Sequence, residues 1–192
     1  MTAPTHPTLE PGRVYRTRDF AAWTANAPRL AKRLLAKGLV RLGHGLFTYP
    51  KRGRFGTVPP ADEEILRAFL DGGPFVLTGP ERWNALGLGS TGLFAVPLVY
   101  NTKRSGTFEL GGRRFMLRRV AFPVQPPAEW FVVDLMENAE QAGVSTSDLT
   151  TTLGRALAAG RFDRDRLREI VSRYGTKSTQ ASVASALAAT PP

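Results

Sequence analysis

The sequence predicts an α+β protein with a small basic N-terminal part and a larger C-terminal part. Residues 17–50 carry the strongest amphipathic pattern and end on a glycine hairpin signal. Residues 75–120 hold short runs of β-branched and aromatic residues between glycine turns, and the pattern after residue 127 is helical. We therefore expect a small α/β region with a mostly antiparallel sheet, followed by C-terminal helices.

Residues 1–12 are predicted to form an extended arm. Pro4, Pro7 and Pro11 fall in this stretch, and each of them disfavours helical backbone in the residue before it. The pair Val14-Tyr15 could then add a short strand beside the hairpin that lies further along the chain.

A short helix is expected over residues 18–23, with Thr17 as its cap. Phe20 and Trp23 lie three residues apart, so they share one face of this helix. Residues 24–27 then form a turn that leads into a second helix.

The second helix, which begins near Pro28, is amphipathic. On a helical wheel, the apolar arc holds Leu30, Ala31, Leu34 and Leu35, and the opposite arc holds Arg29, Lys32, Arg33, Ala36 and Lys37. Proline suits the first turn, with Asn26 or Ala27 at the cap, and Gly38 ends the helix. One face should therefore be buried, and the other is basic.

Residues 39–42 and 46–49 alternate as strands around Gly43-His44-Gly45, which is a tight hairpin signal. Helix, turn, basic helix and hairpin is the layout of a winged helix-turn-helix domain, predicted here over residues 13–58. A basic second helix suits DNA, since it fits the major groove while Arg and Lys reach phosphates and guanine edges. A solvated basic helix packed on a hairpin would leave the same pattern.

The formal net charge of +10 is concentrated near the N-terminus. Residues 1–54 hold 11 Lys or Arg against Glu10 and Asp19, a net charge of +9. Residues 55–192 hold 15 Lys or Arg against 14 acidic residues, a net charge of +1. Such an asymmetry indicates a surface that faces phosphates on the N-terminal part.

Eleven residues are the candidates for DNA contacts. They are Thr24, Asn26, Arg29, Lys32, Arg33, Lys37, Arg41, His44, Lys51, Arg52 and Arg54. Asn26, Arg29 and Arg33 lie in the part of a recognition helix that normally reaches base edges, although Lys32 would lead if the helix were rotated by one position. The remaining cations are better placed for the DNA backbone.

Residues 51–60, KRGRFGTVPP, are typical of a linker rich in Gly, Pro and basic residues. The boundary to a second domain over residues 59–192 is placed here. Lys51, Arg52 and Arg54 could follow a DNA backbone from this linker, or they could simply keep it soluble.

The second domain alternates between helices and strands before it becomes helical. Helices are predicted at 62–70 and 80–86, and strands at 75–78, 94–100 and 107–120. Four further helices are predicted at 128–142, 147–159, 163–174 and 177–188. Their caps should be Ser145 or Thr146, Phe162 or Asp163, and Thr176.

The sequence offers little for a metal, a cofactor or catalysis. It has no cysteine, and its two histidines, His6 and His44, are too few for a metal site. The letters of a dinucleotide fingerprint at 87–92 are accidental, because a helix precedes them and a strand follows, the reverse of what pyrophosphate binding needs. We expect no cofactor, no metal and no enzyme activity.

The remaining charged groups indicate surfaces rather than sites. Glu129, Asp134, Glu137 and Glu140 have spacings that fit a solvated helix face, and the arginines at 113, 114, 118 and 119 suggest an edge strand protected by charge. The N-terminus lacks a signal peptide, and no apolar run is long enough to span a bilayer. We therefore expect a cytoplasmic protein without a membrane segment.

Three stretches of the first 120 residues share a pattern with a known family. They are Gly12-x-Val14-Tyr15-x-Thr17-x-Asp19-Phe20; Leu34-x-x-Lys37-Gly38-Leu39-Val40-Arg41-Leu42-Gly43-x-Gly45-Leu46-Phe47-x-Tyr49-Pro50; and Thr78-Gly79 with Asn84-Ala85-Leu86-Gly87-Leu88. In their order and spacing they resemble the AbiEi antitoxins of bacterial type IV toxin–antitoxin systems.

The resemblance implies a winged-helix antitoxin that represses its own operon by binding inverted repeats in the promoter. It also implies a partner, an AbiEii-like nucleotidyltransferase toxin, and no enzyme activity of the chain itself. Two alternatives remain open. One is a stand-alone winged-helix regulator whose C-terminal domain senses a ligand or makes a dimer, and the other is an enzyme on nucleic acid that uses the basic domain as an anchor.

Overall fold

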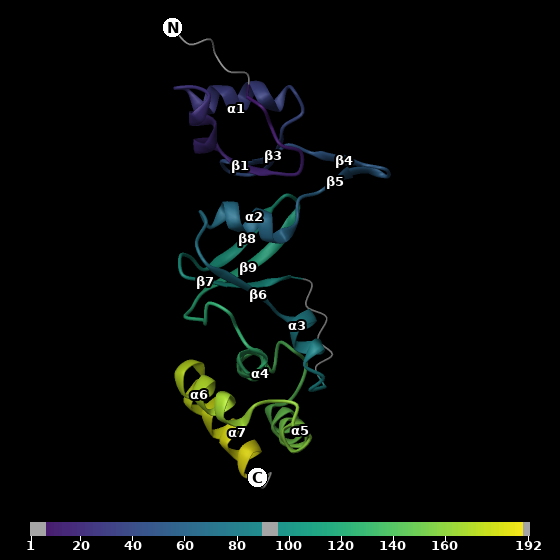
Figure 1. Cartoon of the computed structure of the whole chain (residues 1–192), viewed down its shortest axis with the longest axis vertical. Coiled ribbons are helices and arrows are strands. Elements are labelled where there is room, and N and C mark those ends of the chain that lie inside the picture. Colours follow the sequence, from purple (N-terminus) through teal and green to yellow (C-terminus); the bar gives the residue numbers. More distant parts are fainter. Residues whose placement is uncertain (1–6, 90–95, 190–192) are drawn as a thin grey trace. The chain divides into compact units, whose positions relative to one another are not determined.

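A computed structural model describes residues 7–89 and 96–189 of the chain (Figure 1). The chain divides into two compact units. The first combines the residues up to Phe75 with Thr107–Phe115, and the second combines Val76–Gly106 with the residues from Met116 onward. Both contain helices and strands, so the α+β class predicted from the sequence is confirmed.

The first unit begins with a small antiparallel sheet against one short and one longer helix (Figure 1). Its elements are β1 (Val14–Arg16), the 3-10 helix η1 (Thr17–Ala22), α1 (Ala27–Leu35), β2 (Val40–Gly43) and β3 (Leu46–Thr48). The strand order is β1-β3-β2, and both pairs are antiparallel. The strand expected at Val14-Tyr15 is therefore present and pairs with the hairpin.

The core of this sheet and its helices is aromatic and aliphatic. Tyr15, Phe20 and Phe47 are buried beside Leu30 and Leu34 of α1. The rings of Phe20 and Phe47 lie 5.7 Å apart between centroids. The apolar arc predicted from the helical wheel is thus the buried face of α1.

The predicted cap of the first helix is wrong. Thr17 does not cap η1; the carboxylate of Asp19 instead accepts the Arg16 backbone N–H at 2.7 Å. The Thr17 hydroxyl faces the Gly45 carbonyl oxygen at 3.5 Å. The acidic side chain reaches back from the first turn and satisfies the N–H of the cap residue itself, a different donor from the first-turn N–H that a capping threonine would satisfy.

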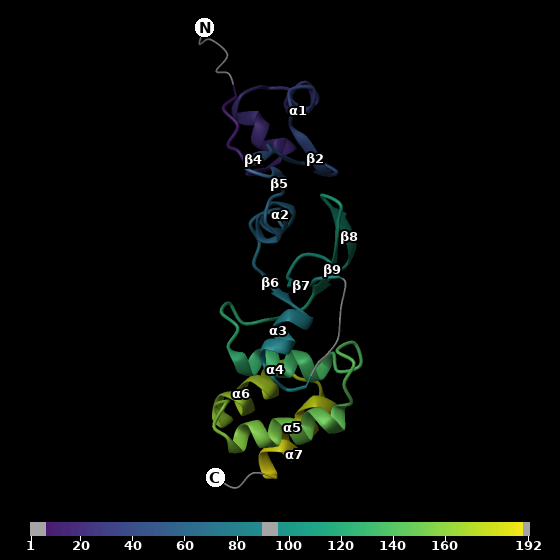
Figure 2. The ribbon, with the colours of Figure 1, turned by 90° about the vertical axis from the view of Figure 1, so that its right-hand side faces the viewer.

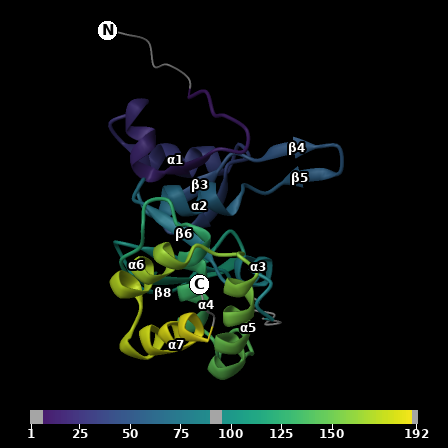
Figure 3. The same ribbon diagram turned by 60° about the horizontal axis from the view of Figure 1, so that its bottom comes forward.

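Residues 51–60 are not a linker. They contain a two-stranded antiparallel hairpin, β4 (Lys51–Gly53) with β5 (Gly56–Val58), which we call the basic hairpin (Figure 3). The composition that suggested a linker serves a tight turn instead, because Gly56 has a φ of +114°, which glycine adopts without strain. The first unit also continues past this point, to α2 (Asp62–Phe69) and Phe75.

Ion pairs connect α2 and its neighbours within the first unit. Asp71, just after α2, pairs with Arg16 and with Arg18. Asp62, in the first turn of α2, pairs with Arg113 at 2.6 Å, and the same guanidinium donates to the Pro60 carbonyl oxygen. These arginines are therefore part of the internal structure of the unit.

A four-stranded sheet has the order β6-β7-β9-β8. Its strands are β6 (Phe75–Thr78), β7 (Leu98–Asn101), β8 (Gly106–Leu110) and β9 (Arg113–Arg119). β7 and β9 are parallel, a pairing that the sequence analysis did not anticipate. Of the strand predicted at 94–100, residues 94 and 95 lie outside the described residues.

The arginine-rich strand is not an edge strand. β9 lies between β7 and β8, so both of its sides are paired. Arg118 donates to Asn138 Oδ1 at 2.8 Å and to Gln141 Oε1 at 3.3 Å. Its charge serves internal hydrogen bonds rather than protection of an open edge.

The second unit is mainly helical (Figure 2). It contains α3 (Pro80–Ala85), α4 (Ala128–Glu137), α5 (Thr146–Ala158), α6 (Arg164–Tyr174) and α7 (Lys177–Ala188). Ser145, Asp163 and Thr176 cap the last three helices, as expected. α4 is shorter than the predicted 128–142, and turns follow it.

Candidate nucleic-acid interface

The outer face of α1 presents the candidate base-reading residues. Arg29, Lys32, Arg33 and Lys37 are all exposed, the last of them just after the helix. Asn26 is the cap, and its side-chain oxygen accepts the Arg29 backbone N–H at 3.1 Å. Since one lone pair of that oxygen is engaged in the cap, Asn26 keeps its amide N–H₂ and one acceptor position to meet a ligand.

Thr24 has a local structural role. Its hydroxyl oxygen accepts the Asn26 backbone N–H at 3.2 Å, in the turn before α1. Thr24 and Asn26 together satisfy backbone donors at the start of the helix. They fix where the basic face begins.

The β2–β3 hairpin and the basic hairpin carry the other candidates. Arg41 is exposed on β2, with its guanidinium carbon 5.7 Å from the centre of the Phe47 ring, and His44 is exposed at the turn. Lys51, Arg52 and Arg54 are exposed on the basic hairpin. Stacking of Arg41 on an aromatic ring orients a guanidinium while leaving its charge available.

The cations of the first unit fall into two groups. Arg13, Arg16, Arg18, Arg67 and Arg113 each pair with an acidic side chain. In the part of the chain that the structure describes, no ion pair is formed by Arg29, Lys32, Arg33, Lys37, Arg41, Lys51, Arg52 or Arg54. Arg114 on β9 is also exposed and forms no ion pair among the described residues, but most of the uncompensated positive charge lies on or next to α1, β2 and the basic hairpin, the elements that the sequence analysis selected.

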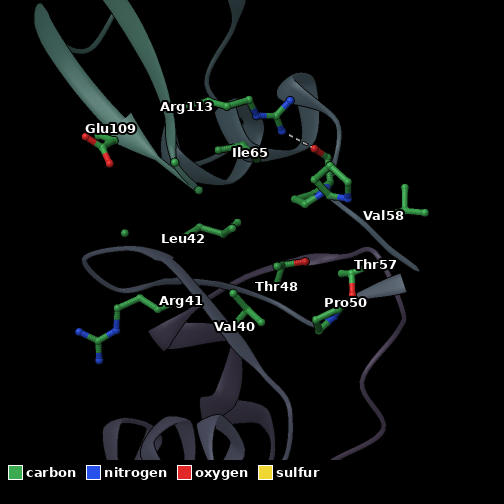
Figure 4. Close-up of a pocket in the computed structure, with 15 residues that line it drawn as sticks. Val40, Arg41, Leu42, Thr48, Pro50, Thr57, Val58, Ile65, Glu109 and Arg113 are labelled. Atoms are coloured by element: carbon green, nitrogen blue, oxygen red, sulfur yellow. Dashed lines mark hydrogen bonds between the residues drawn. The ribbon is translucent and has the colours of Figure 1, made fainter. Parts of the chain in front are cut away.

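A pocket of about 470 Å³ also lies within the first unit (Figure 4). Leu42, Ile65 and Val40 give it an apolar wall, Thr48 and Thr57 line it, and the residues that end the basic hairpin form one side. In Figure 4, Arg41 points away from this space. The pocket thus adjoins β2 and the basic hairpin, and Arg41 is among its lining residues although its guanidinium points outward.

Asp134 in the second unit is not on a solvated face. Asp134 is only 4% exposed. Glu129, which was expected on the same solvated face, is also buried. The Glu129 carboxylate accepts the Asp163 backbone N–H at 3.0 Å. Two of the four predicted surface carboxylates therefore hold the interior of the second unit together.

Four side chains donate hydrogen bonds to Asp134. Its Oδ2 accepts from the Thr78 hydroxyl and from Trp83 Nε1 at 2.7 Å, and its Oδ1 accepts from the Tyr100 hydroxyl at 2.6 Å and from Asn138 Nδ2 at 3.1 Å. Burial raises the pKa of Asp134, and the hydrogen bonds partly oppose that rise. Burial and the neighbouring carboxylate also raise the pKa of Tyr100, which therefore stays a donor.

Within the described residues there is no cluster of three or more His, Asp or Glu side chains that could hold a metal ion. Gly87–Leu88–Gly89 of the accidental fingerprint follow α3, while the remainder of that motif, residues 90–92, lies outside the described residues. None of the described helices combines the length and the apolar character needed to cross a membrane.

No family model and no curated protein matches the chain. The fold is similar to that in the crystal structure of the RV2827C protein from Mycobacterium tuberculosis, with a TM-score of 0.56. The similarity covers 94% of this chain and 77% of that chain, at 15% sequence identity. At such low identity it establishes a shared fold and nothing about activity.

Proposed function

We propose that this chain is a DNA-binding bacterial antitoxin that represses its own operon. The observation that carries DNA binding is the group of exposed cations on α1, β2 and the basic hairpin that form no ion pair within residues 7–89 and 96–189. The order strand, short helix, basic helix and hairpin supports an N-terminal winged helix, with α1 as the recognition helix. A repressor of this kind acts on promoter inverted repeats, which locates it in the cytoplasm.

The antitoxin part of the proposal rests on the resemblance of residues 12–120 to the AbiEi family. Its partner is then an AbiEii-like nucleotidyltransferase encoded beside this gene. Expression of that neighbour alone should arrest growth, and co-expression with this chain should restore it. If co-expression of this chain does not relieve the growth arrest, the antitoxin part of the proposal is wrong and only the repressor role remains.

We further propose that the chain is not an enzyme. Asp134, which the sequence analysis assigned to a solvated face, already accepts two hydrogen bonds at each oxygen, so its carboxylate has no lone pair left with which to bind a metal. Labelled DNA, RNA and nucleoside triphosphates should remain unchanged after incubation with the chain and divalent metals.

Groove reading and phosphate attraction can be separated by single substitutions. Arg29→Ala or Arg33→Ala should cost about 1–3 kcal/mol on the promoter fragment and relax sequence preference, whereas Lys51→Ala should weaken all duplexes alike and lower the salt slope by about one unit. The measurement is binding to the promoter and to an unrelated duplex at two salt concentrations. Arg67→Ala, which removes an exposed cation already paired with Glu64, is the matched control. It should change neither the affinity for the two duplexes nor the salt slope.

The pocket beside β2 favours a second candidate, a stand-alone regulator that responds to a ligand. Its apolar walls suit a small apolar molecule. An apolar dye such as anilinonaphthalene sulfonate should then bind the chain and change its affinity for the promoter, and Val40→Trp should block both effects. Dye binding that leaves DNA affinity unchanged would count against this regulator.

A further inference from the structure

The basic hairpin has a narrow, defined tip. Gly53 and Gly56 face each other across the two strands and enclose the turn residues Arg54 and Phe55. A Cβ atom on Gly53 would lie 2.9 Å from Val58 Cγ2, too close for any larger residue without a shift. Because both flanking positions lack side chains, the turn presents only an arginine and an aromatic ring at its end.

The ring of Phe55 is almost completely exposed. The residue has 98% of its surface accessible, and Lys51, Arg52 and Arg54 lie beside it without an acidic residue anywhere in 51–61. The hairpin extends away from the β1-β3-β2 sheet (Figures 1 and 3). An apolar tip on a cationic ribbon matches a polyanion with an apolar interior, which is what stacked base pairs between phosphates provide.

We propose that the basic hairpin enters the DNA minor groove and that Phe55 inserts as a wedge between neighbouring base pairs, bending the duplex. This inference rests on the proposed DNA-binding function. The minor groove is only about 6 Å wide, so a tip flanked by two glycines suits it better than a turn with bulky flanks. At about 3.3 Å per residue the tip reaches roughly 17 Å beyond Pro50, more than the depth of the groove.

The cations have a defined role in this arrangement. Lys51 and Arg52 are consecutive strand residues, so their side chains lie on opposite faces of the ribbon and can meet the phosphates on both walls of the groove. Arg54 at the tip enters with the ring, where the potential of the groove is negative. The cost of unstacking one base step is then offset by phosphate contacts and by burial of the aromatic ring.

The experiment uses the full chain with a promoter duplex that carries a dye at each end and 2-aminopurine at successive positions. Wild-type chain should increase energy transfer between the ends and raise 2-aminopurine fluorescence at one step. Phe55→Ala should abolish both signals and weaken binding on the order of tenfold, while Phe55→Trp should retain them. Val124→Ala, which truncates an apolar side chain 91% exposed elsewhere, is the control and should behave as wild type.

The outcomes separate this inference from the proposed function. If Phe55→Ala binds and bends the promoter as wild type does, the wedge is wrong and DNA binding stands. If the wild type binds no duplex, both are wrong. Loss of binding to single strands or to anionic phospholipid vesicles, with duplex binding and bending unchanged, would assign Phe55 to that other partner and overturn the wedge.

Discussion

Asp134→Asn should destabilise the second unit by about 2–4 kcal/mol. The amide keeps the shape of the carboxylate, but one oxygen is replaced by an N–H₂ group. That group would face side chains that now donate hydrogen bonds to Asp134, such as the Trp83 indole or the Tyr100 hydroxyl. A buried donor left without an acceptor costs its full desolvation. Urea unfolding followed by tryptophan fluorescence in a Trp23→Phe background measures this, because Trp83 and Trp130 both lie in the second unit.

Glu140→Gln is the matched control for this substitution. Glu140 follows α4 and is exposed, so its loss of charge should change the free energy of unfolding by less than about 0.5 kcal/mol. Equal effects of Asp134→Asn and Glu140→Gln would show that the hydrogen-bonded carboxylate does not stabilise the unit.

The difference in stability between wild type and Asp134→Asn should depend on pH, and the raised pKa of Asp134 fixes the direction of that dependence. Since the pKa of Asp134 is raised in the folded chain, its proton stabilises the fold fully below the unfolded pKa of about 3.9, and that stabilisation is lost as the pH rises through the folded pKa. The stability gap between wild type and Asp134→Asn should therefore widen from pH 7 towards pH 4. A stability difference that narrows on acidification would mean that the hydrogen bonds lower the pKa of Asp134 by more than burial raises it.

Local signals in the sequence predicted α1 well. Its apolar and basic arcs, the proline in its first turn and Gly38 after it all act within one helix, and the structure has the same buried face, the Asn26 cap and a Gly38 φ of +98°. The caps Ser145, Asp163 and Thr176 were predictable for the same reason. Such features depend on neighbours within a few residues.

Features that depend on distant partners were not predictable in this way. Three of the four donors to Asp134 come from 34 to 56 residues earlier in the chain, so the spacing of acids on α4 could not reveal them. One signal was present: Asp134 is the only charge in the run WFVVDLM, which a solvated face would not produce. Likewise, two glycines separated by two residues at 53–56 indicate a hairpin as well as a linker.

Reversing three charges on α1 should have the largest effect on DNA binding. In the variant Arg29→Glu, Lys32→Glu, Arg33→Glu, three exposed cations become anions facing the phosphates. Since loss of each contact alone costs about 1–3 kcal/mol, affinity for the promoter should fall by at least about a hundredfold at low salt. The slope of log affinity against log salt should also fall by about three units.

The control reverses Arg166, Arg173 and Lys177 of the second unit, all of them exposed. Each reversal changes the charge by two, so either triple variant has a net charge of +4 in place of +10. If the position of the charges decides binding, the control should retain most of its affinity for the promoter, because α1, β2 and the basic hairpin keep their cations. Circular dichroism checks the fold, since the new acids near the end of α1 oppose its dipole. Equal losses in the two variants would mean that net charge alone attracts DNA and that α1 has no special role.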